Sequence, residues 1–261
     1  MIPESQRRRK QKGSGVGLII NPRGTNGSGK TEFVRRILAD YGWGESDRGE
    51  PIHRVGRGRP IGYRLRHPLG RRPLVVLGHY ERISGGCDTI SAKDGGLDEA
   101  FRLADAWAAA GHDVLFEGST LSAEHERSAS LAHRHTLHIL CLATPPGQAA
   151  RNLVARRRTR RDSWPLVARG VVAQLGAVEA ACHRLRPIAA VHDLTFDDAL
   201  CLARDLLGLG LAAAATELSG SVHPGGLARM TGGAASLAPH VRCLVPDAGH
   251  CRTDLDAQDP A

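Results

Sequence analysis

The chain has few aromatic residues, no long apolar run and no closely spaced cysteine pair. Aromatics make up 4% of its 261 residues, and no apolar run approaches the roughly 18 residues that a transmembrane helix needs. Its six cysteines include no CxxC pair, and no secretory signal precedes them. We therefore expect a cytoplasmic protein without a membrane span, whose thiols are reduced and mostly packed as small hydrophobic side chains.

Positive charge is in excess, and nearly all of it is arginine. Lys and Arg number 35 against 27 Asp and Glu, which gives a net charge of +8. Residues 1–14 are a basic stretch that we expect to be a disordered arm, and seven arginines fall within residues 50–72. Basic proteins tend to bind phosphate-rich partners, nucleic acid above all.

Apolar runs and amphipathic segments alternate between residues 15 and 209. Strands are predicted at 16–21, 73–80, 113–119, 136–145 and 188–195, with helices between them. This alternation predicts an α/β domain whose mostly parallel five-stranded sheet is covered on both faces, giving three layers. The arginine-rich segment 50–72 is predicted to be an inserted hairpin. Residues 210–261 are rich in small residues and lack periodicity, so we expect a loosely ordered, low-complexity tail.

A glycine-rich loop, RGTNGSGKT, follows the first strand and precedes a helix. Gly24, Gly29, Lys30 and Thr31 satisfy the pattern GxxxxGK[ST], which in this strand-to-helix context binds the phosphates of a nucleoside triphosphate. Lys30 is expected to contact the β- and γ-phosphates of ATP and Thr31 to coordinate Mg²⁺. The backbone of the loop is expected to surround the phosphates at Gly24, Thr25, Asn26, Gly27, Ser28 and Gly29.

The rest of the domain is typical of a small P-loop kinase rather than of a motor or switch protein. Arginines are concentrated after the fourth strand, where residues 147–163 are predicted to form a helical lid. Phosphoryl transfer passes through a highly anionic transition state, which arginine stabilises. Arg157 is expected to bind the nucleotide and Arg158 to act in catalysis, from a set that also includes Arg151, Arg156, Arg160 and Arg161; a solvated basic helix is the alternative.

Two acidic residues are candidates for chemistry at the acceptor. Glu117 is expected at the carboxyl end of its strand, on the edge of the sheet that carries the loop, where it can hold Mg²⁺ or grip the acceptor. Asp88, in the glycine-rich segment SGGCDTI, is the candidate base or orienting group for an acceptor hydroxyl, and Glu81 is its rival. His79 and Tyr80 could stack on a base, or be part of the sheet's core and rim.

Histidines and cysteines elsewhere offer weaker candidate metal ligands. His133, His135 and His138 lie at a helix-to-strand junction, without an acid or cysteine at useful spacing. Cys243, His250 and Cys251 lack a second spaced pair. We therefore predict no metal at either group, and Mg²⁺ only at Thr31 and Glu117.

The combination of RGTNGSGKT, LGHYERISGGCDTI and VLFEGS resembles the 5-hydroxymethyluracil DNA kinases of bacterial viruses that hypermodify thymine. The resemblance covers roughly residues 15–209. It implies a P-loop kinase fold and transfer of the γ-phosphate of ATP to the hydroxymethyl group of the modified base in DNA, in the cytoplasm of a bacterial host. Lys30 and Thr31 would then serve ATP and Mg²⁺, while Asp88 and Glu117 would face the acceptor.

Three other functions fit the same residues. The strand VLFEGS also resembles small-molecule and toxin kinases, so the acceptor could be a free nucleotide, a nucleoside or another small metabolite. A kinase of 5′-hydroxyl polynucleotide ends is a further alternative. The third is a module that binds ATP and DNA without transferring phosphate. A DNA acceptor accounts for the net positive charge and for the arginine-rich insert, which a kinase of free nucleotides does not need.

Overall fold

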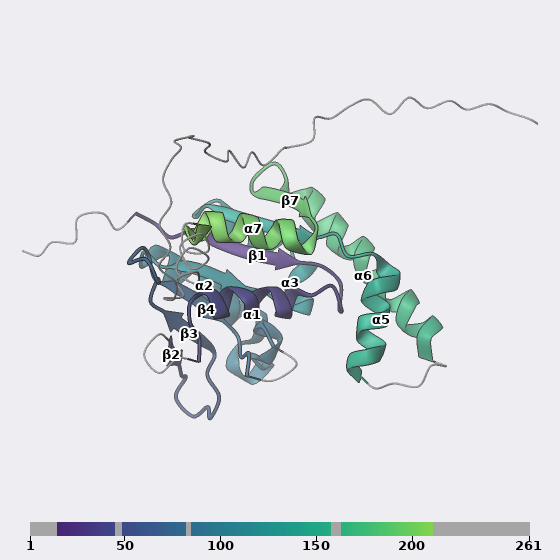
Figure 1. Ribbon diagram of the computed structural model, residues 1–261, viewed down its shortest axis with the longest axis horizontal. Coiled ribbons are helices and arrows are strands. Elements are labelled where there is room, and N and C mark those ends of the chain that lie inside the picture. The colour runs from purple at the N-terminus through teal and green to yellow at the C-terminus, as the bar shows by residue number, and fades with distance from the viewer. Residues whose placement is uncertain (1–14, 45–48, 82–84, 158–162, 211–261) are drawn as a thin grey trace, which may run out of the picture. The chain divides into compact units, whose positions relative to one another are not determined.

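The computed structural model describes residues 15–44, 49–81, 85–157 and 163–210, all within one compact unit of the chain (Figure 1). The predicted arm at 1–14 and nearly all of the predicted tail, 211–261, lie outside the described residues. The elements below therefore belong to the predicted kinase domain.

Five parallel strands form the centre of the sheet. The apolar strand that precedes the glycine-rich loop is central, with one parallel partner on each side. In spatial order the strands are β4 (Leu74–Leu77), β5 (Asp113–Phe116), β1 (Ile19–Arg23), β6 (Leu137–Leu142) and β7 (Ala190–Leu194). Four of the five lie within segments predicted to be strands, and β1 begins within the predicted 16–21 and continues to Arg23. Apolar runs predicted them because strands of parallel sheets are typically buried on both faces.

The sheet has seven strands rather than the predicted five. The arginine-rich insert contributes β2 (Gly49–Ile52) and β3 (Gly62–Leu65), which pair antiparallel with each other, and β3 pairs antiparallel with β4. Tyr63 and Leu65 are buried while Arg64 between them is exposed. This alternation of apolar and charged residues lets the insert extend the sheet although it is rich in arginine.

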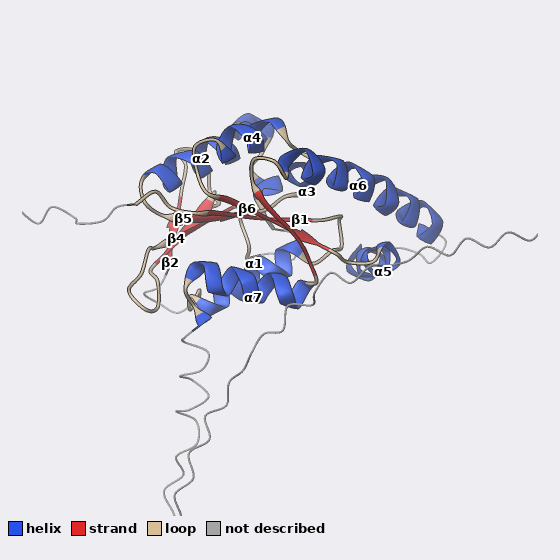
Figure 2. Ribbon diagram, turned by 90° about the horizontal axis from the view of Figure 1, so that it is seen from above, coloured by secondary structure: helices blue, strands red, loops and turns tan. Residues whose placement is uncertain are grey.

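Helices cover both faces of the sheet (Figure 2). On one face lie α1 (Lys30–Asp40) and α7 (Phe196–Leu207), and on the other lie α2 (Gly96–Ala109), the short α3 (Ser119–Ser122) and α4 (Glu126–Ala132). Neighbouring residues of β1 serve opposite faces, since Ile19 packs into the core beneath α2 and Ile20 into the core beneath α1. The predicted apolar face of α1 is buried, with Phe33, Val34, Ile37 and Leu38 all fully enclosed.

Two helices follow β6 and lie next to the glycine-rich loop. They are α5 (Pro146–Arg157), within the predicted lid, and α6 (Trp164–Leu185). Ala149 and Leu153 of α5 pack against Val171 of α6 in a small separate core. Contrary to the expectation that no segment was apolar enough to cross a membrane, α6 passes that test by length and composition, with a mean hydropathy of 1.2. Val178 and Leu185 in its C-terminal half pack into the core beneath α2, and 22% of its most apolar 18-residue window is buried. One helix that passes by length and composition does not by itself indicate a membrane span.

Candidate active site

The glycine-rich loop joins β1 to α1 in a conformation that needs glycine. Gly29, at the N-terminus of α1, has φ of +100°, and Gly27 has φ of +84°. A Cβ atom on Gly27 would lie 2.2 Å from the carbonyl oxygen of Ala149 in α5. Side chains at these positions would be strained and would separate the loop from α5, so the sequence pattern has a direct steric cause.

Lys30 lies across the loop with its side chain almost fully buried. Its Nζ donates hydrogen bonds to the carbonyl oxygens of Gly24 at 2.8 Å and Thr25 at 2.9 Å, and the residue is 6% exposed. Burial lowers the pKa of Lys30, while nearby Glu117 and Asp88 oppose this shift. The ammonium group of Lys30 is buried and its hydrogen-bond partners are neutral carbonyl oxygens, so its positive charge favours the binding of an anion. This agrees with the expectation that the loop binds a triphosphate.

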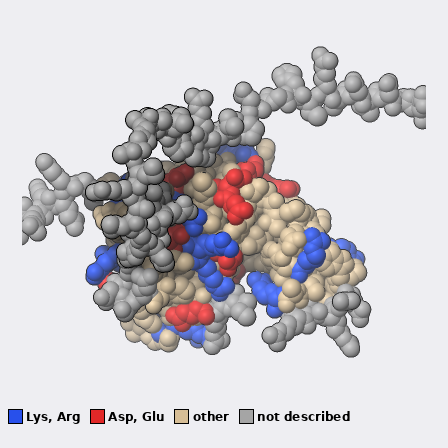
Figure 3. Space-filling model, in the orientation of Figure 1, with Lys and Arg blue, Asp and Glu red and all other residues tan. Residues whose placement is uncertain are grey.

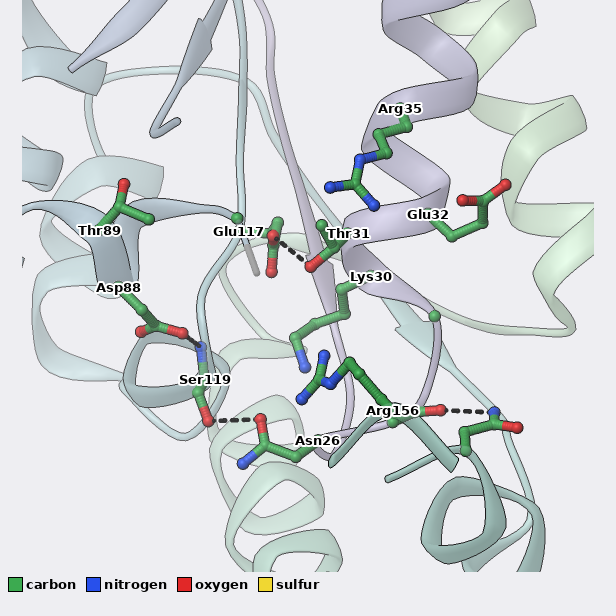
Figure 4. Close-up of a pocket in the computed structure, with 14 residues that line it drawn as sticks. Asn26, Lys30, Thr31, Glu32, Arg35, Asp88, Thr89, Glu117, Ser119 and Arg156 are labelled. Atoms are coloured by element: carbon green, nitrogen blue, oxygen red, sulfur yellow. Dashed lines mark hydrogen bonds between the residues drawn. The ribbon is translucent and has the colours of Figure 1, made fainter. Parts of the chain in front are cut away.

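Thr31 and Glu117 place two oxygen ligands beside Lys30 (Figure 4). The Thr31 hydroxyl donates to Glu117 Oε1 at 3.1 Å, and Glu117 directly follows β5, as predicted. Glu117 is 2% exposed, and burial raises its pKa to about 7, with Lys30 opposing the shift. Because Mg²⁺ in kinases is typically held by a carboxylate, a hydroxyl and substrate phosphates, this oxygen pair suits that ion.

Asp88 lies in a short 3₁₀ turn, Cys87–Thr89, on the other side of the cavity. Its Oδ2 accepts a 2.6 Å hydrogen bond from the backbone N–H of Ser119, the first residue of α3. The backbone N–H of Cys87 donates to the carbonyl of Glu117 at 2.7 Å. Asp88 is thus held at a fixed position relative to Glu117, and one of its oxygens already caps a helix.

Glu81, the predicted rival of Asp88, is engaged outside this cavity. It accepts a hydrogen bond from the Tyr63 hydroxyl at 3.2 Å and lies 3.2 Å from His79 Nε2. His79 is 4% exposed and Tyr80 1% exposed, so the idea that either stacks on a base is wrong for this structure. Both rings are buried, and Tyr80 packs in the core beneath α1, which agrees with the alternative that they belong to the core of the sheet.

Arginines reach the cavity from two helices. Arg156 of α5 and Arg35 of α1 both line it, whereas the guanidinium of Arg151 binds the Gln148 side chain on the exposed surface of α5. Arg35 also donates to the carbonyl of Tyr80 at 3.3 Å. The side chain of Arg157 and the whole of Arg158, with Arg160 and Arg161, lie outside the described residues, so their predicted roles stay predictions.

Three polar side chains that the sequence analysis did not single out connect α3, α5 and α6 to the glycine-rich loop. Gln174 of α6 accepts from the backbone N–H of Asn26 at 2.7 Å and donates to the Ser119 hydroxyl at 3.2 Å. Ser119 in turn donates to Asn26 Oδ1 at 2.8 Å. Asn152 of α5 donates to the carbonyl of Gly27 at 2.8 Å. The only hint in the sequence is that Gln174 interrupts the apolar run VVAQLGAV.

Two arginines of the insert stabilise the loop that carries Asp88. The Arg57 guanidinium donates to the carbonyl of Thr89 at 2.6 Å and to Asp94 Oδ2 at 3.1 Å, and Arg54 donates to the carbonyl of Asp94. The Arg57 side chain is 12% exposed. Part of the positive charge that we attributed to DNA binding is therefore used inside the protein.

The residues above surround a cavity of about 370 Å³. Its lining combines the loop, the candidate acids Asp88 and Glu117 and both arginines, namely Asn26, Gly27, Gly29, Lys30, Thr31, Glu32, Arg35, Gly85, Asp88, Thr89, Glu117, Ser119, Asn152 and Arg156.

The histidines at the helix-to-strand junction have partners outside this cavity. His135 pairs with Asp105 at 2.6 Å, and His138 stacks on His192. Among the described residues no group of three or more His, Cys, Asp or Glu side chains is arranged to hold a metal.

Comparison with known proteins identifies a relative from a bacterial virus. The chain is 36% identical over 172 residues to a protein of Pseudomonas phage PaMx11 named 5-hmdU DNA kinase. The match covers 64% of this chain and 84% of the phage protein. No protein-family model matches the chain. The resemblance inferred from the loop, the GGCDTI segment and the VLFEGS strand is confirmed by this match.

Proposed function

Because the chain belongs to the family of 5-hmdU DNA kinases, we propose that it transfers the γ-phosphate of ATP to the hydroxymethyl group of 5-hydroxymethyluracil in DNA. The proposed acceptor rests on this family membership. The cavity between the glycine-rich loop and Asp88 supports the chemistry, because it brings together groups for a triphosphate and for a hydroxyl. The relative comes from a phage, so the protein would act in the cytoplasm of an infected bacterium.

The loop would hold the triphosphate of ATP. Its backbone N–H groups and the N-terminus of α1 provide positive potential, and Lys30 can leave the carbonyls of Gly24 and Thr25 to contact the β- and γ-phosphates. The hydroxyls of Thr25 and Ser28 are buried without a hydrogen-bond partner in the described part of the chain. Such groups gain a partner when an anion enters the loop, which favours this use.

Thr31 and Glu117 would hold Mg²⁺, which when bound neutralises charge on the phosphates and fixes their geometry. The carboxylate of Glu117 is buried, and this loss of contact with water raises its pKa although the Lys30 ammonium opposes the shift. A cation beside Thr31 would favour the ionised form of Glu117.

Asp88 would orient the acceptor hydroxyl. In the reaction the hydroxymethyl oxygen bonds to the γ-phosphorus, the bond from that phosphorus to the β,γ-bridging oxygen breaks, and ADP leaves. The hydroxyl proton passes to the Asp88 carboxylate and then to water. Oδ2 of Asp88 accepts the short 2.6 Å bond from Ser119 N–H, whereas Oδ1 accepts only a long 3.5 Å bond from Thr120 N–H, so Oδ1 is the oxygen better able to accept from the substrate hydroxyl. Arg156 and Arg35 would stabilise the negative charge that spreads over the transferring group.

The surface beside the cavity is suited to DNA. Figure 3 shows Lys and Arg side chains over α1 and over α5 and α6. Of these helices, α1 and α5 provide the arginines of the cavity. A base within a duplex cannot reach Lys30 and Glu117, which are 6% and 2% exposed. The hydroxymethylated base would have to leave the stack. Since His79 and Tyr80 are buried, the backbone and arginine side chains at the cavity's rim would have to receive it.

The test is a comparison of acceptors. γ-Labelled ATP with Mg²⁺ would be offered to matched duplexes with blocked 5′ ends, containing either thymine or 5-hydroxymethyluracil, and separately to free nucleosides and nucleotides and to DNA with free 5′-hydroxyls. We expect label only in the hydroxymethylated duplex, and its loss in Lys30→Ala. Label in a monomer, or only at 5′ ends, would refute the proposed acceptor while leaving the kinase assignment intact.

A further inference from the structure

Two cysteines far apart in the sequence meet beside the strand that leads into the glycine-rich loop. Cys141 of β6 and Cys182 of α6 place their sulfur atoms 2.7 Å apart, and both are free thiols. Cys182 is 3% exposed, and Cys141 is partly buried. Both line a second cavity, of about 380 Å³, which is separate from the one that holds Lys30 and Glu117.

Charged groups surround this pair on three parallel strands. In the sheet register, Cys141 lies opposite Arg23 of β1 on one side and Asp193 of β7 on the other. Arg23 is fully buried, and its guanidinium donates to neutral acceptors, namely Asn21 Oδ1, the carbonyls of Ser122 and Glu124, and the Ser128 hydroxyl. A buried guanidinium with neutral acceptors favours a negative charge nearby.

The thiolate of Cys182 is placed to provide that charge. The Cys141 S–H group donates to the sulfur of Cys182. This hydrogen bond and the neighbouring Arg23 and Arg186 guanidinium groups lower the pKa of Cys182 against the effect of burial. Thiolates beside arginine are the reactive form of cysteine. The Asp193 carboxylate raises the pKa of Cys182. Its ion pair with Arg186 makes this opposing influence smaller than that of a free carboxylate.

We propose that Cys141 and Cys182 form an oxidisable dithiol site, which a peroxide converts reversibly to a disulfide. The Cys182 thiolate attacks one peroxide oxygen, the O–O bond breaks, hydroxide leaves and a sulfenic acid forms on Cys182. The Cys141 sulfur then attacks the Cys182 sulfur, the S–S bond forms, and the second oxygen leaves as water. Two thiols are oxidised by two electrons, and one peroxide is reduced to two waters.

The geometry favours this product over intermolecular disulfides. A disulfide needs a sulfur separation of about 2.05 Å, so the two sulfur atoms must approach by less than about 1 Å. The product would tether α6 to β6, eight residues along α6 from Gln174, which contacts the loop through Asn26. It would also remove the thiolate from Arg23, the residue that precedes Gly24. The inference rests on the thiol pair and is independent of which acceptor the enzyme phosphorylates.

The test is to map disulfides in the folded, full-length chain after treatment with hydrogen peroxide. Free thiols would be alkylated, the chain digested and the peptides identified by mass spectrometry. We expect one cross-link, between the peptides of Cys141 and Cys182, with a mass lowered by about 2 Da and restored by dithiothreitol. Two fewer of the six thiols of the chain would then react with a thiol reagent.

Variants separate this site from general oxidation. Cys201→Ser, which removes an exposed thiol, should leave the cross-link unchanged, whereas Cys141→Ser should abolish it and leave Cys182 to accumulate as sulfenic acid. The mapping uses wild-type protein, so its outcome does not depend on whether a variant folds. Oxidation that appears at Cys201 or between chains while Cys141 and Cys182 stay reduced would overturn the proposal.

Discussion

Glu117→Gln is expected to stabilise the protein at high pH and to remove its activity. Burial raises the pKa of Glu117 from the ordinary value of 4.5 to about 7. Below pH 4.5 the carboxyl is protonated in both the folded and the unfolded chain, so it does not affect stability. As the pH rises, the unfolded chain loses this proton first, and the free energy of unfolding falls until the pH passes about 7. The full loss is roughly 3 kcal/mol, at about 1.4 kcal/mol for each pKa unit.

Glutamine is neutral at every pH and can still accept the hydrogen bond of Thr31 through its amide oxygen. The free energy of unfolding would be measured in urea, without nucleotide or Mg²⁺, for the variant and the wild type. The difference between the two proteins should be about 3 kcal/mol more favourable to the variant at pH 8 than at pH 4.5. Glu81→Gln is the control, because it replaces a carboxylate that is 57% exposed rather than buried. A Glu117→Gln difference that is the same at pH 4.5 and pH 8 would refute the account of this carboxyl. Phosphoryl transfer by the variant should fall roughly a hundredfold or more.

Three further predictions concern the groups around the cavity. Lys30→Ala should lower kcat/KM for ATP by roughly 10²- to 10³-fold without changing the circular dichroism spectrum, since its ammonium serves the phosphates; normal turnover would exclude the loop from catalysis. Arg156→Ala should lower kcat, whereas Arg151→Ala, on the exposed surface of α5, should not. If both variants lower the steady-state rate equally, the effect comes from the loss of positive charge in general. Gln174→Ala removes two hydrogen bonds, one to the loop and one to its neighbour Ser119, so the KM for ATP should rise about tenfold. A KM equal to that of the wild type would show that α6 does not position the loop.

The parts of the site that depend on local sequence could be predicted. The GxxxxGK[ST] pattern fixes a loop between a strand and a helix, so Lys30 and Thr31 are located by their neighbours in the chain. Glu117 could be located because the carboxyl ends of parallel strands share one edge of the sheet. Asp88 was placed near the acceptor by its glycine-rich context, and the structure puts it in the same cavity as Glu117.

Features that depend on contacts between distant segments could not be predicted. Gln174 meets Asn26 across 148 residues of sequence, and the pairing of Arg57 with the loop of Asp94 needs the insert to fold against it. The insert was predicted to be a hairpin, but its pairing with the sheet could not be predicted, because only a short alternation around Tyr63 among its glycines, prolines and arginines is typical of a strand. For His79 and Tyr80 the sequence left open both stacking on a base and a place in the sheet's core and rim, because the polar atoms of a ring do not reveal whether it is buried.

The identity of the phosphorylated atom is the central claim, and the mass of the product tests it most directly. Duplex DNA containing 5-hydroxymethyluracil would be incubated with the enzyme, ATP and Mg²⁺, digested to nucleosides with enzymes that spare a phosphate on the base, and analysed by mass spectrometry. We predict that the hydroxymethyl nucleoside is replaced by one about 80 Da heavier, the mass added by phosphorylation, with the phosphate on the base rather than the sugar. An unchanged hydroxymethyl nucleoside, under conditions in which the enzyme converts ATP to ADP, would contradict the proposed reaction.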